Sequence, residues 1–191
     1  MDFAYTPRVK ELEAQLTRFM ETHVVPRDRE WHRQSEAGKF PPDFCESIKA
    51  AATAEGLWDM FLPTLPDDAP ATRLSNLEYA PLAEIMGRIY WSPEMFNCNA
   101  PDTGNMEILH MFATPDQKRH YLQRLLAGEI RSAFCMTEPE VASSDATNIR
   151  TSIRREGGDY VINGRKWFIT NATHPLLGIM IVMGVTNPDA E

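Results

Sequence analysis

The sequence is poor in cysteine, and its three cysteines form no recognisable pattern. Cys45, Cys98 and Cys135 are odd in number and widely spaced, without a C-x-x-C pair or a neighbouring histidine. A disulfide framework needs paired cysteines, and a zinc site needs closely spaced ligands. The five histidines show no ligand-like spacing either. The sequence therefore predicts a reducing compartment and no metal site.

Runs of positive charge and long apolar runs are also missing. The formal net charge is −8, and lysines and arginines are scattered along the chain. Nucleic acids and anionic membranes both select a basic face, so neither is an expected partner. The longest strongly apolar stretch, 176–185, is far shorter than the roughly 20 residues that span a bilayer. The start, Met1-Asp2-Phe3, lacks the basic and apolar segments of a secretory signal.

What the chain does have is a 43% hydrophobic composition, arranged first in helical periods. Thr6 and Pro7 begin a predicted helix whose apolar stripe ends near Pro26. A second helix is predicted after the prolines at 41–42, ending at Gly56. The proline- and aspartate-rich segment 65–72 is typical of a surface loop.

Two further helix starts carry the pattern of a capping box. In 75–78 the serine and glutamate side chains are spaced to satisfy free backbone N–H groups, and the segment 114–117 repeats this pattern with threonine and glutamine. Gly128 ends the last of these helices. Residues 1–128 are therefore predicted to form an all-α helical domain.

After Gly128 the apolar period changes from that of a helix to that of a strand. Residues 130–137 alternate, Gly157-Gly158 and Asn163-Gly164 are hairpin-turn dipeptides, and 178–185 is a further strand. Residues 129–191 are therefore predicted to form a partial, antiparallel β-domain. The fold class expected for the chain is α+β, with the helical bundle first.

Four short motifs occur in order across these predicted strands. They are FCMTEP at 134–139, SD at 144–145, YVINGRK at 160–166 and ITN at 169–171. This combination resembles the acyl-CoA dehydrogenase family, and it is most similar to the branch that in animals is fused to a kinase-like domain. The resemblance implies a helical N-terminal domain and the first strands of a middle β-barrel, with the family's C-terminal helical domain absent.

The resemblance also implies FAD as the cofactor, bound through the two strand-end motifs. Thr137 and Thr170 match the threonines near the polar edge of the flavin ring, and fixed donors there stabilise the charge of the reduced ring. The serine at 144 matches the one facing the FAD pyrophosphate and the acyl-CoA chain, although the register of Ser143 against Ser144 stays open. The remaining implied flavin contacts are Phe134, Met136, Phe168 and Ile169.

For the reaction, the resemblance implies α,β-dehydrogenation of an acyl-CoA to an enoyl-CoA. No catalytic residue is assigned, because the family's carboxylate base comes from the absent domain and Glu138 is expected only to shape a turn. We expect a truncated chain that is inactive alone, and a homo-oligomer, dimer or tetramer, at full length. Electron-transfer flavoprotein is the expected redox partner, and the expected location is cytoplasmic, or mitochondrial in a eukaryote.

Two alternatives remain at this point. One is a different enzyme on the same scaffold, an acyl-CoA oxidase or a flavin-dependent hydroxylase. The other is a flavin-free helical module that binds another protein. Reaction with oxygen separates the first alternative from a dehydrogenase, and failure to take up FAD would favour the second.

Overall fold

The computed structural model describes residues 4–62 and 74–188, so the predicted loop at 65–72 lies outside the described residues. The chain packs as two compact units, Met1–Thr103 and Gly104–Glu191. The boundary between the units does not coincide with the change from helix to strand near Gly128.

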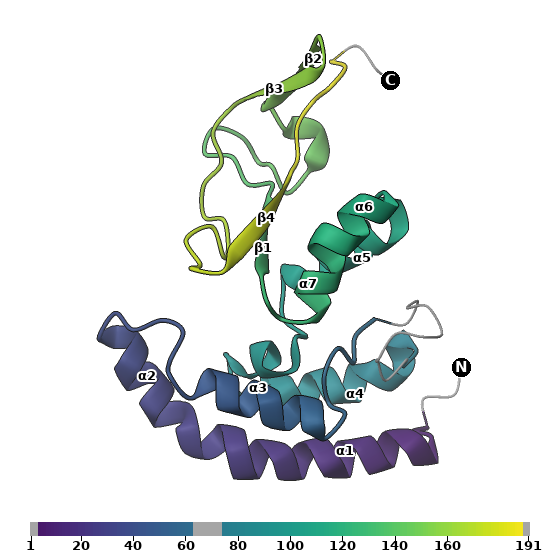
Figure 1. Ribbon diagram of the computed structural model, residues 1–191, viewed down its shortest axis with the longest axis vertical. Coiled ribbons are helices and arrows are strands. Elements are labelled where there is room, and N and C mark those ends of the chain that lie inside the picture. Colours follow the sequence, from purple (N-terminus) through teal and green to yellow (C-terminus); the bar gives the residue numbers. More distant parts are fainter. Residues whose placement is uncertain (1–3, 63–73, 189–191) are drawn as a thin grey trace. The chain divides into compact units, whose positions relative to one another are not determined.

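The first unit begins with one long helical run, seen as the purple rod in Figure 1. Its segments are α1 (Pro7–Phe19), the π-helix η1 (Met20–Val24), the 3-10 helix η2 (Val25–Arg27) and α2 (Asp28–Glu36). The Thr6 hydroxyl caps α1 by accepting the Val9 N–H at 3.2 Å. Pro26 does not end the run as predicted, because it lies in the first turn of η2, where a missing N–H breaks no helical bond.

The rest of the first unit consists of α3 (Cys45–Ala54), α4 (Asn76–Gly87) and the 3-10 helix η3 (Ser92–Phe96). The predicted capping box of α4 is present in both directions between Ser75 and Glu78. Gly56 follows α3 with a φ of 71°, as the C-terminal signal predicted. The core of this unit is built from α1, η1, α4 and η3, whose fully buried side chains include Leu16, Phe19, Met20, Leu82, Met86, Met95 and Phe96.

The helical part of the second unit contains most of α5 (Asp102–Phe112), then α6 (Pro115–Gln117), the π-helix η4 (Lys118–Leu122) and α7 (Gln123–Leu126). The second predicted capping box, between Thr114 and Gln117, is present. Gly128 follows with a φ of 71°, which ends the helix before the first strand. A hydrogen bond of 2.8 Å from Asn105 Nδ2 to Ser132 Oγ joins α5 to that strand.

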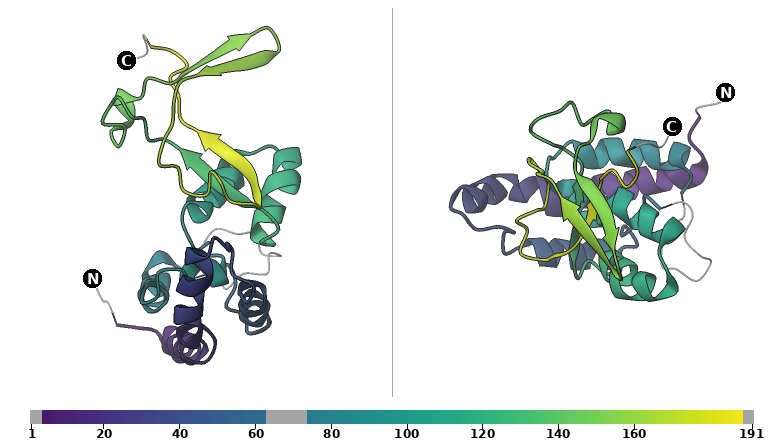
Figure 2. Two further views of the ribbon diagram at one scale, coloured as in Figure 1. Left: turned by 90° about the vertical axis from the view of Figure 1, so that its left-hand side faces the viewer. Right: turned by 90° about the horizontal axis from the view of Figure 1, so that it is seen from above.

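The strands are β1 (Arg131–Cys135), β2 (Ser152–Glu156), β3 (Asp159–Asn163) and β4 (Leu177–Val182), with a 3-10 turn η5 (Ala146–Asn148) after β1. Strands β2 and β3 form the predicted antiparallel hairpin through Gly157-Gly158. Strands β1 and β4 pair in parallel, which differs from the all-antiparallel expectation. The long connection between β1 and β4 makes a parallel crossover possible. Figure 2 shows the hairpin extending away from the β1–β4 pair.

The Asn163-Gly164 dipeptide is not the second hairpin turn that its sequence predicts. After β3 the chain enters a long loop, 164–176, before β4 begins. Gly164 is required by close packing, because a Cβ atom there would lie 2.8 Å from the Cα atom of Thr151. The glycine is therefore needed for close packing, and the prediction of a turn there was wrong.

Candidate functional site

The candidate site consists of two loops of the second unit that lie side by side. The first, residues 136–145, follows β1, and the second, residues 164–176, precedes β4. The Trp167 N–H donates to the carbonyl oxygen of Thr137 at 3.1 Å. The Asn171 side-chain amide donates to the carbonyl oxygen of Ser132 at 3.0 Å. These bonds bring the two predicted motifs together, although they are about thirty residues apart in the sequence.

The predicted contact residues are exposed or half-buried, and all of them lie on these loops except Phe134, which is in β1. Thr137, Ser144 and Thr170 are exposed, whereas Phe134, Met136 and Ile169 are half-buried. Thr170 lies in a turn and not on a strand, so its position is set by the loop bonds described above. The site thus presents hydroxyl groups beside partly covered apolar side chains.

Phe168 has both an exposed side chain and an unusual backbone. Its side chain is 81% exposed, and its φ is 49°. A bulky residue in this left-handed region is strained, and such strain is found where the surrounding structure imposes it, often at functional sites. The ring lies 4.6 Å, centroid to centroid, from that of Trp167, which is itself 45% exposed. The pair forms an aromatic surface next to the loop that carries Thr137.

The two serines at 143 and 144 have different environments. Ser143 is buried, and its hydroxyl accepts the Glu138 N–H at 2.8 Å. Ser144 is exposed. Its neighbour Asp145 accepts hydrogen bonds from the Thr147 hydroxyl and N–H, which lower the pKa of that carboxyl group. The geometry therefore leaves Ser144, and not Ser143, accessible to a ligand.

Glu138 is 5% exposed, yet the pKa of its carboxyl group is low. Burial alone raises its pKa, but hydrogen bonds from Thr151, Lys166 and the Arg150 N–H outweigh this effect and lower the pKa to about 2. The sequence predicted only a turn-shaping role. The partners that it missed, Thr151 and Lys166, lie far along the chain. The sequence held one indication of them: an acidic residue directly follows an apolar strand, and a buried carboxylate needs hydrogen-bond donors.

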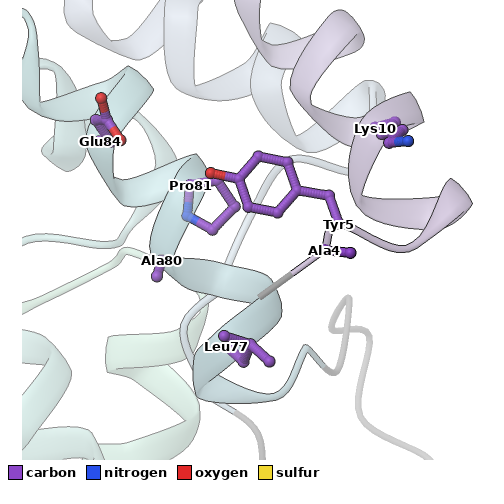
Figure 3. Close-up of a pocket in the computed structure, with 7 residues that line it drawn as sticks. All are labelled: Ala4, Tyr5, Lys10, Leu77, Ala80, Pro81 and Glu84. Atoms are coloured by element: carbon purple, nitrogen blue, oxygen red, sulfur yellow. The ribbon is translucent and has the colours of Figure 1, made fainter. Parts of the chain in front are cut away.

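The first unit has a surface pocket that contains none of the predicted contact residues. Figure 3 shows it between the start of α1 and α4, with the Tyr5 ring beside Pro81. Lys10 and Glu84 contribute charged groups to its lining. Within residues 4–62 and 74–188 there is no cluster of three or more His, Cys, Asp or Glu side chains suited to a metal ion. In the same ranges no helix combines the length and the apolarity that crossing a membrane requires.

The residues on the two loops fit a flavin. A planar heteroaromatic ring with one polar edge needs an aromatic or apolar surface and nearby hydrogen-bond donors. Phe168 and Trp167 provide exposed aromatic area, and Thr137 and Thr170 provide exposed hydroxyls on bonded loops. The Phe168 ring is 81% exposed, so its burial contributes little to folding. These exposed side chains are placed to contact a bound group and do not pack in the protein core.

Known families match nearly the whole chain. The model of the acyl-CoA dehydrogenase N-terminal domain matches residues 6–129, and that of the middle domain matches residues 133–191. The chain is 50% identical over 198 residues to the probable acyl-CoA dehydrogenase FadE2 of Mycobacterium tuberculosis, covering all of this chain and 46% of that protein. It is 45% identical over 190 residues to acyl-CoA dehydrogenase family member 11 of Gallus gallus, covering 96% of this chain and 24% of that one.

Solved structures resemble the fold as well. A putative acyl-CoA dehydrogenase from Mycobacterium abscessus has a TM-score of 0.91 and 47% identity, with 98% of this chain and 48% of that chain covered. PigA, solved with FAD and proline, has a TM-score of 0.72 and 25% identity, with 100% of this chain and 46% of that chain covered. The chain thus spans less than half the length of these relatives. It belongs to the acyl-CoA dehydrogenase family.

Proposed function

We propose that this chain provides the FAD-binding loops of an acyl-CoA dehydrogenase that converts an acyl-CoA thioester to an enoyl-CoA. The observation that carries the proposal is the bonded pair of loops, on which Thr137, Phe168 and Thr170 are all exposed. Family membership supports the dehydrogenase chemistry, and the relative PigA was solved with FAD.

Each predicted contact residue has a proposed role toward the cofactor. Thr137 and Thr170 donate hydrogen bonds to the polar edge of the flavin, while Phe134, Met136, Phe168 and Ile169 contact its apolar part. FAD, when bound, supplies the acceptor for the hydride that leaves the β-carbon of the substrate. Ser144 faces phosphate groups of the cofactor and the acyl-CoA chain, and losing such a hydrogen bond to a charged group costs on the order of 1.5–3 kcal/mol.

Glu138 is not proposed as the base that removes the α-proton. Its two carboxylate oxygens already accept hydrogen bonds from Arg150, Thr151 and Lys166. A carboxylate held in this way has a pKa of about 2 and is a poor proton acceptor near neutral pH. For residues 1–191 by themselves we therefore expect flavin binding without turnover.

The domain limits and partners also remain proposals. A helical domain at 1–128 and a β-domain at 129–191 are supported by the limits of the two family models, 6–129 and 133–191. Electron-transfer flavoprotein is the proposed electron acceptor. A dimer or tetramer is the proposed assembly of the protein that carries these domains.

A flavin titration tests the cofactor proposal. Adding FAD to the purified protein should quench flavin fluorescence along a weak but saturable curve, and Thr137→Val with Thr170→Val should weaken binding by about tenfold or more, as expected for two lost hydrogen bonds. Glu140→Gln, on the same loop but 52% exposed in its side chain, is the matched control and should bind as the unmodified protein does. Absence of any FAD uptake would contradict the proposal.

The reaction is tested in the protein that carries this chain and the rest of a family-length sequence. Acyl-CoA oxidation with an artificial electron acceptor should yield enoyl-CoA, whereas oxygen consumption without that acceptor should be slow. Fast oxygen consumption would instead identify an oxidase or a hydroxylase. A protein that turns over no acyl-CoA of any chain length would overturn the dehydrogenase assignment.

A further inference from the structure

A largely buried ion pair joins the two loops of the candidate site. The Lys166 ammonium group lies 2.9 Å from Glu138 Oε1, and the side chains of Glu138 and Lys166 are only 4% and 12% exposed. Lys166 also donates to the carbonyl oxygen of Met136 at 2.9 Å. One side chain of the second loop therefore holds two groups of the first.

The Glu138 carboxylate is satisfied from a third segment as well. Its Oε1 atom accepts the Thr151 N–H at 2.8 Å and the Thr151 hydroxyl at 2.6 Å, and Oε2 accepts the Arg150 N–H at 2.8 Å. The backbone N–H of Glu138 in turn donates to the buried Ser143 hydroxyl. A buried carboxylate with this many donors fixes the relative positions of all the segments that supply them.

The exposed contact residues sit directly beside these anchors. Thr137 lies between Met136 and Glu138, both of which are held by Lys166. Phe168 and Thr170 follow Lys166 on the second loop, and Trp167 closes the connection through its bond to Thr137. The side chains of Glu138 and Lys166 are 4% and 12% exposed, while Thr137, Phe168 and Thr170 are exposed, so the two sets have separate tasks.

We infer that Glu138 and Lys166 are positioning residues, which set the loop of Thr137 against the loop of Phe168 and Thr170 and thereby form the flavin surface. This inference rests on the proposed function for its ligand. It assigns the pair no part in proton transfer, because neither group is free to reach a substrate.

The chain contains a matched control pair one position away on the second loop. Arg165 forms an ion pair with Glu140, linking the same two loops, but their side chains are 71% and 52% exposed. Solvent-exposed pairs contribute little to holding a structure in place. Matched substitutions at the two pairs therefore distinguish the effect of losing the ion pair of Glu138 and Lys166 from the effect of removing a charge in general.

The test compares Glu138→Gln and Lys166→Met with Glu140→Gln and Arg165→Met in the purified protein. Hydrogen exchange without FAD should become at least tenfold faster in peptides covering 164–176 in the first two variants and change less than twofold in the controls. The FAD dissociation constant should rise at least tenfold in the same two variants. At saturating FAD, their visible circular dichroism should differ from that of the unmodified protein, since this signal reports how the ring is held.

Lys166→Arg should recover most of the binding and exchange protection, because it keeps the charge and a donor. If Glu138→Gln does not fold, the results for Lys166→Met alone test the inference, since this variant keeps the three hydrogen bonds that Arg150 and Thr151 donate to Glu138. Exchange, affinity and dichroism within twofold of the unmodified protein in Lys166→Met would overturn the inference. If the unmodified protein binds no FAD, the proposed function fails, whereas the exchange comparison still shows whether the pair holds the loops.

Discussion

At the scale of single residues, Phe168 combines an exposed aromatic ring with a left-handed backbone conformation. The left-handed region costs roughly 1–2 kcal/mol for a residue with a side chain, and an exposed ring recovers little of this by burial. Folding alone therefore gives no reason for phenylalanine at this position. The residue is explained if its ring meets a ligand.

Replacing Phe168 by glycine should weaken FAD binding about fivefold to tenfold, because an aromatic contact of about 1 kcal/mol is lost. The free energy of unfolding should stay within about 1 kcal/mol, since relief of strain offsets the greater flexibility of glycine. Urea denaturation and FAD titration measure the two effects. A large loss of stability with unchanged FAD affinity would show that the ring serves the fold.

Asp59 is a second residue whose environment has a measurable consequence. It is 4% exposed and has a φ of 55°, and it accepts a hydrogen bond of 2.7 Å from Asn97 Nδ2. Burial raises its pKa from 3.8 to about 8, against the opposing effect of the Asn97 hydrogen bond. At neutral pH this carboxyl group is therefore protonated in the folded protein and ionised in the unfolded chain.

The sign of the pH dependence follows from that difference. The folded state binds the extra proton. The contribution of Asp59 to the free energy of unfolding should therefore fall by about 1.4 kcal/mol for each unit of increase in pH between roughly pH 4 and pH 8. Asp59→Asn keeps the acceptor for Asn97 and should remove this slope while stabilising the protein at pH 7.5. Urea titrations of both proteins across this range give the slopes, and equal slopes would contradict the raised pKa.

At the scale of elements, Gly164 and Gly158 provide a direct comparison within the hairpin region. A Cβ atom at Gly164 would come within 2.8 Å of the Thr151 Cα atom, whereas at Gly158 it would meet nothing within 4 Å. Gly164→Ala should therefore cost about 1–3 kcal/mol by overpacking. Gly158→Ala should change stability by less than about 1 kcal/mol. Thermal or urea unfolding distinguishes them, and equal costs would show that Gly164 is not closely packed.

Sequence reasoning predicted the elements that depend on near neighbours. Both capping boxes, at Ser75 and Thr114, and the Gly157-Gly158 hairpin are confirmed because their partners lie within a few residues. Features set by distant partners were missed or wrong. The parallel pairing of β1 with β4 joins strands far apart in the sequence, so no local pattern encodes it. The helical run passes Pro26 because this proline falls in the first turn of η2, a position that the sequence pattern did not reveal.

The same distinction holds for the candidate site. The motif containing Thr137 and the one containing Thr170 could be found in the sequence, and the bonded loops place them near each other. The positions of the individual flavin contacts remain predictions. The ion pair of Glu138 and Lys166 could not be predicted, because burying this carboxylate requires donors that two separated segments, 150–151 and the one with Lys166, bring to it.

At the scale of the whole chain, β3 presents an apolar strand to solvent. All five of its residues are exposed, among them Tyr160, Val161 and Ile162. In the part of the chain that the structure describes, β3 pairs with β2 alone. A strand with an open, apolar edge promotes association between molecules.

Val161→Glu should therefore reduce concentration-dependent association of the 191-residue chain. Glutamate at this position lies opposite Arg154 in the antiparallel pair, so the hairpin gains a favourable cross-strand contact. The free energy of unfolding should change by less than about 0.5 kcal/mol, as expected for an exposed site. Light scattering over a range of concentrations measures the effect, and unchanged association would place the contact elsewhere.

The reactivity of the three buried thiols can be used to detect local opening of the chain. Cys45 and Cys98 lie in the first unit and Cys135 in the second, and burial raises the pKa of the first two to about 12 and that of Cys135 in the same direction. Thiol reagents attack the thiolate, so each cysteine is shielded both by its surroundings and by its protonation. Maleimide labelling followed by peptide mass analysis will therefore report, unit by unit, which part of the chain opens first.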